Sequence, residues 1–200
     1  MRLGPLVLAA SLMLSGQALS QSAVGKAVVD GRTVTLFDDG TWKYADAPTA
    51  TQGACQDVTP TVQFCAAALG WASTQPSTPG VAAAYRIDAR HYAQYLIEDL
   101  GSDDGVTVEI MRQVALKNAK TASGNTPEVI DVQRVSMGRL TGDTMISKVR
   151  INGLEAVFAN SLFVEQKRVM QIMTYAIAGE YTPQHAGYHE KLLANTKLTP

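Results

Sequence analysis

The alternation of apolar and polar positions is clearest between residues 144 and 178, where apolar-rich runs are separated by short polar turns. The first turn is Asn152-Gly153, and Asn-Gly favours a tight hairpin because both residues accept positive φ angles. The pattern predicts an antiparallel meander with strands at 144–151, 155–165 and 168–178. Alternate residues of the middle strand divide between two largely uncharged faces. We therefore expect helices to cover part of each face.

Helical patterns flank this meander. Thr107 precedes an amphipathic segment that ends near Lys120, and its expected inward stripe is Ile110, Met111, Val114, Ala115 and Asn118. Thr182-Pro183 has the form of an N-cap followed by a first-turn proline. The inward positions of that last helix are expected to be Ala186, His189, Leu192, Leu193 and Thr196. Thr59-Pro60 predicts one more short helix that ends at Gly70, with its apolar face made of Val62, Cys65, Ala66 and Leu69.

Further strands are predicted at 81–87, 92–98 and 129–135, with a turn-rich link over 136–143. The segment around 91–100 also fits a helical spacing, but its aromatic and β-branched content favours a strand. The mixture of helices with antiparallel strands indicates an α+β fold, in which helices flank an antiparallel sheet.

A separate small unit is predicted near the N-terminus. Asp30-Gly31 and Asp39-Gly40 are turn signals that predict a three-stranded meander over 21–45. Trp42 and Tyr44 alternate onto one face of it. They are either aromatics that face a partner or the core that such a small sheet needs. Residues 46–57, rich in Ala, Thr, Pro and Gly, form a predicted linker to the main domain at 58–200.

The first residues have the pattern of a signal peptide. Arg2 is followed by an apolar run over 3–14, and Ala18-Leu19-Ser20 places small residues where a signal peptidase cleaves. We expect residues 1–20 to be removed, since the run is shorter than the roughly 20 residues of a membrane span. The alternative is an uncleaved N-terminal anchor. The protein is therefore expected to be periplasmic or secreted, without integral membrane association after cleavage.

Charge gives no reason to expect a nucleic-acid partner. Removing Arg2 lowers the 17 basic residues to 16, against 18 acidic residues, a balance of −2. Nucleic-acid-binding domains usually carry a clear basic excess. The chain contains two cysteines, Cys55 and Cys65. An even count in an exported chain favours a disulfide, and their spacing does not match that of a redox-active pair.

Histidines are the main candidates for metal chemistry. His185 and His189 are four residues apart on a predicted helix, the spacing of a zinc pair, and His91 would have to supply a further ligand. The alternative places His189 against the sheet and His185 in a solvated first turn. Methionines of the meander suit a core or a copper(I) site, although Met170 and Met173 should face opposite sides of one strand. Asp38-Asp39 and Asp103-Asp104 are read as turn formers, since neither has the ligand density of a calcium loop.

The order of elements resembles the Mog1/PsbP-like fold, including exported bacterial proteins of the DcrB group, and this resemblance implies an α/β/α sandwich. The resemblance rests on Gly70-Trp71, the helix at 107–120, and the run from Gly153 to Leu193. It covers about 130 residues of the chain. Residues 34–44 also resemble a short β element of exported bacterial proteins. Members of the Mog1/PsbP-like family are mostly binding or assembly proteins, so the resemblance implies an accessory role and no catalytic residues.

No nucleophile elbow, phosphate-binding loop or metal cage is evident in the sequence. The function expected first is therefore that of a non-enzymatic periplasmic accessory protein that binds a protein or an envelope component, without a cofactor. One alternative is a carrier of a small molecule or metal in a cavity between the sheet and the helices. A second alternative is an exported hydrolase.

Overall fold

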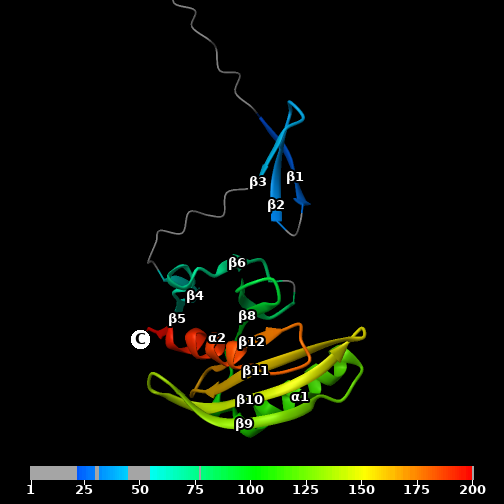
Figure 1. Cartoon of the computed structure of the whole chain (residues 1–200). Coiled ribbons are helices and arrows are strands. Elements are labelled where there is room, and N and C mark those ends of the chain that lie inside the picture. The colour runs from blue at the N-terminus through cyan, green and yellow to red at the C-terminus, as the bar shows by residue number, and fades with distance from the viewer. Residues whose placement is uncertain (1–21, 30–31, 45–54, 77, 200) are drawn as a thin grey trace, which may run out of the picture. The chain divides into compact units, whose positions relative to one another are not determined.

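The computed structural model describes residues 22–29, 32–44, 55–76 and 78–199, and it divides the chain into compact units at 1–48 and 49–200. In the first unit, β1 (Ala23–Val29), β2 (Arg32–Phe37) and β3 (Trp42–Tyr44) form an antiparallel sheet in that order (Figure 1). The predicted small meander is therefore confirmed. The predicted signal segment, the Asp30-Gly31 turn and most of the predicted linker lie outside the described residues.

The second unit is built on a seven-stranded sheet in the order β6-β7-β8-β12-β11-β10-β9, and every neighbouring pair is antiparallel. This arrangement confirms the α+β class. The strands are β6 (Ala72–Thr74), β7 (Val81–Arg86), β8 (His91–Glu98), β9 (Glu128–Met137), β10 (Leu140–Ile151), β11 (Leu154–Val164) and β12 (Val169–Ala176).

The Asn-Gly turn has the predicted geometry. Asn152 and Gly153 have φ angles of 51° and 83°, and Ile151 pairs with Leu154 across the turn. Strand β10 is longer than predicted, because the expected link over 136–143 is wrong. A two-residue turn at Gly138 joins β9 to β10, and the positive φ of Gly138 fits the first central position of a tight hairpin turn.

The helix predicted from Thr59-Pro60 is wrong. Its residues form the strands β4 (Gln56–Thr59) and β5 (Val62–Phe64), and Pro60 lies in the turn between them. Proline fixes φ near the value that a turn needs as well as the one that a helix needs, so the motif was ambiguous. Helical backbone is confined to the short 3₁₀ helix η1 (Ala66–Leu69), which ends at Gly70 as predicted.

The C-terminal strand β13 (Thr196–Leu198) pairs with β5 and completes a small three-stranded sheet in the order β13-β5-β4. Thr196 therefore begins a strand and does not extend the last helix as predicted. The predicted disulfide is present between Cys55 and Cys65. Because Gln56 pairs with Phe64, the two cysteines occupy the next opposed positions of the β4–β5 hairpin.

The helices α1 (Val108–Ser123) and α2 (Pro183–Ala194) begin at the predicted caps. The hydroxyl oxygen of Thr107 accepts a hydrogen bond from the amide of Ile110, and that of Thr182 accepts one from the amide of His185. Helix α1 contacts β10 and β11, whereas α2 contacts β12 (Figure 1).

The inward stripe of α1 differs from the prediction. Met111 is buried and packs against Leu162 and Val169, but Ile110 and Val114 are each 44% exposed. The residues of α1 that pack on the sheet or line the space beneath it are Met111, Ala115, Leu116, Asn118, Ala119 and Ala122, so Met111, Ala115 and Asn118 lie on the predicted side. Their spacing follows the helical period. Because three of them are alanines, α1 packs tightly near its start and leaves space beneath its second half.

Candidate functional site

The space beneath the second half of α1 is a cavity of about 220 Å³. Its roof is made by the second half of α1, with three alanines, Leu116 and Asn118, and its floor is the face of the sheet that includes β8, β12, β11 and β10. The lining is predominantly apolar, and no Asp, Glu, Lys, Arg or His side chain contributes to it among the described residues. The cavity therefore suits an uncharged and largely apolar ligand.

A row of side chains crosses the floor of this cavity. Backbone pairing places Met145, Asn160, Met173 and Gln94 side by side on four adjacent strands, and all four line the cavity. The row alternates thioether and carboxamide groups. It is joined by Gln171, which lies one step along β12 on the same face. Three carboxamides of the sheet, with Asn118 of α1 as a fourth, therefore line a largely apolar space.

The carboxamides are only partly satisfied by one another. Asn160 Nδ2 donates to Gln171 Oε1 at 3.1 Å, and Gln94 Nε2 contacts the sulfur of Met173 at 3.2 Å. The carboxamide oxygen of Asn160 is buried and has no hydrogen-bond partner. Leaving such an acceptor unsatisfied costs about 1–3 kcal/mol. Asn160 is thus suited to accept a hydrogen bond from a group that enters the cavity.

An aromatic row lies beside the amide row on the same face. Tyr92 and Tyr175 stack at 5.2 Å between ring centroids, and Tyr175 and Phe158 stack at 5.4 Å. Phe158 also lines the cavity. Burial raises the pKa of Tyr175. Because the rings stack on one another, the row forms a firm wall at one end of the cavity.

The opposite face of β11 and β12 carries a buried network of hydroxyls and imidazoles. The hydroxyl of Ser161 lies 2.6 Å from Thr144 Oγ1 and 2.7 Å from His189 Nε2. Thr174 Oγ1 then lies 3.1 Å from His189 Nδ1 and 3.0 Å from His185 Nε2. Burial lowers the pKa of His189 to about 3 and that of His185 to about 4, so both rings are neutral at physiological pH.

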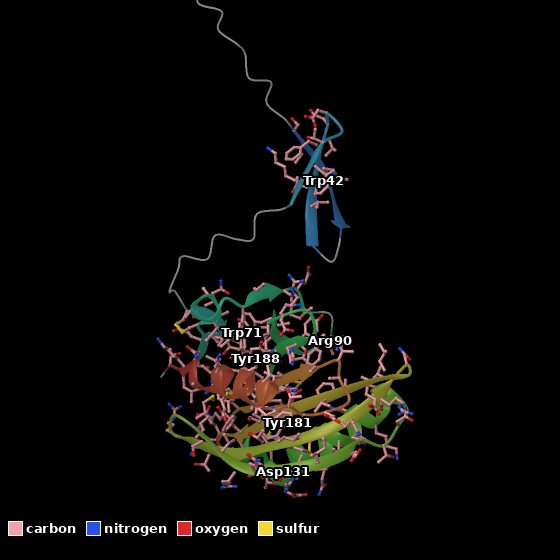
Figure 2. All side chains as sticks on the ribbon, in the orientation of Figure 1. Trp42, Trp71, Arg90, Asp131, Tyr181 and Tyr188 are labelled. Carbon is pink, nitrogen blue, oxygen red and sulfur yellow. A yellow bond between two sulfur atoms is a disulfide. The ribbon has the colours of Figure 1, made fainter. Side chains whose placement is uncertain are left out.

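The network continues toward the surface at the first turn of α2. The rings of His185 and His91 are 5.6 Å apart, and His91 Nδ1 lies 2.9 Å from the carboxylate of Asp88. Tyr188 also donates to Asp88, and its ring lies 6.3 Å from that of Trp71 (Figure 2). Burial acts to raise the pKa of Asp88, but hydrogen bonds from Arg90 and His91 outweigh it and bring that pKa to about 2.

His185 and His189, which were predicted as a zinc pair, lie close together, but ring nitrogens of both contact hydroxyl groups. Both nitrogens of His189 contact hydroxyls, and Thr174 Oγ1 sits between the two rings. Among the described residues, no group of three or more His, Cys, Asp or Glu side chains could hold a metal ion. The expectation that His185 lies in a solvated turn is wrong, because its side chain is 1% exposed. The hydroxyl of Thr174 gives it a polar partner inside the core.

Ser161 and His189 have the separation of a nucleophile and its base, yet the pair is sealed. Ser161 is fully buried and His189 is 4% exposed. The second nitrogen of His189 contacts the Thr174 hydroxyl, where a catalytic triad would place a carboxylate. The arrangement satisfies buried polar groups and offers no route for a substrate to the hydroxyl.

The remaining sequence candidates fall in several places. Met170 belongs to the main core, whereas Met173 lines the cavity, so the two face opposite sides of β12 as predicted. In the small sheet, Trp42 is 48% exposed and pairs with Leu36. The prediction for the Tyr44 side chain lies outside what the structure describes. Sequence reasoning missed the three carboxamides, although polar side chains at Asn160 and Gln171 within apolar strands were the available signal.

The sequence matches no protein-family model, and comparison with curated proteins gives no match. The structure is similar to cyanobacterial PsbP (CyanoP) from Synechocystis sp. PCC 6803, with a TM-score of 0.55 and 14% identity over 77% of this chain and 98% of that one. It is also similar to LpqN, involved in cell envelope biogenesis of Mycobacterium tuberculosis, with a TM-score of 0.39 and 18% identity over 65% and 71% of the chains. The chain thus has a PsbP-like fold. Among the described helices, none is long and apolar enough to cross a membrane.

Proposed function

We propose that this protein is a non-enzymatic periplasmic accessory protein that binds an envelope component, and that the ligand occupies the cavity beneath α1. The observation that carries the proposal is the cavity itself, with its uncharged lining and the three carboxamides on its floor. A ligand site of this kind is typically a largely apolar space with a few well-placed polar groups.

The structure of α1 supports this site. Met111 packs the start of the helix against Leu162 and Val169, whereas small residues such as Ala115 and Ala119 face the sheet farther along. Larger side chains at these positions would fill the space. In an α/β/α arrangement α1 then acts as the roof of a binding site, and α2 seals the polar network on the other face.

Binding is favoured over hydrolysis because the Ser161–His189 pair is sealed in the core and lacks a carboxylate partner. Export to the periplasm is supported by the signal-like pattern of residues 1–20 and by the disulfide between Cys55 and Cys65, which forms and persists in oxidising compartments. Trp42 of the small sheet is proposed as an additional partner-facing residue, since nearly half of its side-chain surface is exposed.

The proposal is tested with phenylnaphthylamine, an uncharged probe that fluoresces in apolar sites. We expect saturable binding to the wild-type protein and its loss in the Ala119→Phe variant, whose added ring fills the cavity. Val114→Phe is the matched control, because the same ring is added on the exposed side of α1. Equal binding to wild type and Ala119→Phe, with both proteins folded, would place the probe elsewhere and refute the proposed site.

A further inference from the structure

Beyond the existence of the site, the chemistry of its floor bears on the class of ligand. This inference rests on the proposed function. We infer that the cavity selects a neutral alkyl or acyl chain that carries a hydroxyl or amide N–H, and that Asn160 is the residue that recognises this donor.

Asn160 is buried, and only part of its carboxamide is hydrogen-bonded. Its side chain is 6% exposed, and its amide nitrogen is already committed to Gln171 Oε1. Its carboxamide oxygen therefore remains a buried acceptor without a partner. An apolar ligand that fills the cavity would leave that oxygen unpaired, whereas a ligand that donates a hydrogen bond to it would remove the penalty.

The described lining of the cavity carries no charged side chain. A carboxylate or an ammonium group would enter an apolar space without a charged partner, which is unfavourable. A neutral hydroxyl or amide meets neutral polar groups, which are the carboxamides of Asn160, Gln171, Gln94 and Asn118 and the hydroxyls of Ser147 and Thr78. Among these side chains, the oxygen of Asn160 is the buried one without a hydrogen-bond partner. The thioethers of Met145 and Met173 flank Asn160 in the row, and they provide adaptable apolar contacts for the chain on each side of the donor.

Phe158 forms the aromatic wall at one end of the cavity. Phe158 is held by its stack on Tyr175, so this boundary of the cavity is fixed by neighbouring strands. A ligand is then positioned by a firm aromatic contact and by one hydrogen bond at Asn160. Such a site discriminates chiefly against analogues that lack the donor, because its buried polar group is then left unpaired.

The test compares octanol with heptyl methyl ether, which has the same number of heavy atoms but no hydrogen-bond donor. Each compound displaces phenylnaphthylamine from the full-length protein. We expect the wild-type protein to prefer the alcohol by about tenfold, the ratio that one satisfied buried acceptor provides. In Asn160→Leu, which keeps the branching and the number of side-chain heavy atoms, that preference should fall to near unity while the ether still binds.

Ser147→Ala is the control variant, since Ser147 lines the same cavity and its loss should leave the preference intact. Equal affinity of the wild-type protein for the two compounds overturns the inference and leaves the proposed binding function standing. If Ser147→Ala abolishes the preference and Asn160→Leu does not, the assignment of Asn160 is wrong. If neither compound displaces the probe, the inference is wrong, whereas the proposed function is decided by the binding of the probe itself. The wild-type comparison requires no variant to fold.

Discussion

Ser161 and His189 are joined by a 2.7 Å contact between Oγ and Nε2 in a part of the core that solvent does not reach. The contact links the middle strand β11 to the last helix α2. Together with Thr174, it gives both nitrogens of a buried imidazole a polar partner, which is what keeps a histidine tolerable in a core.

Acid should destabilise the fold through His185 and His189. Their folded-state pKa values, about 4 and about 3, lie below the ordinary value of 6.5. Between pH 6.5 and those values the unfolded chain binds protons that the folded chain does not. The free energy of unfolding is therefore undiminished above pH 6.5 and falls as the pH decreases, by up to about 1.4 kcal/mol per pH unit for each histidine. Urea unfolding at several pH values measures this slope, and His189→Gln should make it shallower. An unchanged slope in that variant would contradict the assignment.

Removing the hydroxyl of Thr174 should take a hydrogen-bond partner from two buried imidazoles at once. We expect Thr174→Val, which conserves shape, to lower the free energy of unfolding at pH 7.5 by about 1–3 kcal/mol, because nitrogens of His185 and His189 lose a buried partner. A double-mutant cycle with His189→Gln should be strongly non-additive. Additive losses would mean that the two residues do not act as one network.

Reduction of the disulfide should loosen the hairpin that it closes. Cys55 and Cys65 are the two cysteines of the chain, so a reductant acts at this bond alone. Loss of the crosslink should lower the free energy of unfolding by about 2–3 kcal/mol, as expected for a short closed loop. Hydrogen exchange should quicken first in β4, β5 and β13. A Cys55→Ser/Cys65→Ser variant whose stability does not respond to reductant is the control, and exchange that quickens only in α1 would disagree with this account.

The protein should self-associate through the edge strand β9 once the side chain of Asp131 no longer occupies a backbone amide there. Asp131 Oδ1 accepts the backbone amide of Val132 at 2.8 Å, and Val129, Ile130 and Val132 are exposed along the strand. A side chain that occupies an edge amide hinders the addition of another strand. Light scattering should therefore show faster self-association of Asp131→Ala than of wild type. Asp131→Asn keeps the acceptor but loses the charge, so it should behave like wild type. If it instead aggregates like the alanine variant, charge is the protective feature.

A Gly→Ala substitution should change the free energy of unfolding in opposite directions at two positions. Gly153 has a φ of 83° in the turn between β10 and β11, so Gly153→Ala should destabilise the protein by about 1–2 kcal/mol. Gly187 lies within α2, and a Cβ added there would meet no atom within 4 Å. Gly187→Ala should therefore stabilise the protein by about 0.5–1 kcal/mol. Chemical denaturation of the two variants checks both signs, and a loss of stability at Gly187 would contradict the free space assigned there.

Local patterns in the sequence were enough for the elements whose signals lie within a few residues. Asn152-Gly153 fixed a hairpin because its φ angles are intrinsic to those residues, and the caps at Thr107 and Thr182 fixed the helix starts through bonds three residues away. The α+β class was predicted from the mixture of elements, the PsbP-like fold from a resemblance in their order, and the pairing of Cys55 with Cys65 from an even cysteine count in an exported chain.

Tertiary contacts decided what local patterns left open. Thr59-Pro60 became a hairpin turn because β5 pairs with β13, more than a hundred residues away along the chain. His185 is buried because the hydroxyl of Thr174 on β12 meets it, a partner that helical periodicity does not reveal. The cavity exists because the alanines of α1 face β10, β11 and β12 across a space that no single segment encloses. Its polar floor arises from strand register, which places Gln94, Asn160 and Gln171 together. The sequence determined local geometry, and long-range packing determined which polar groups meet.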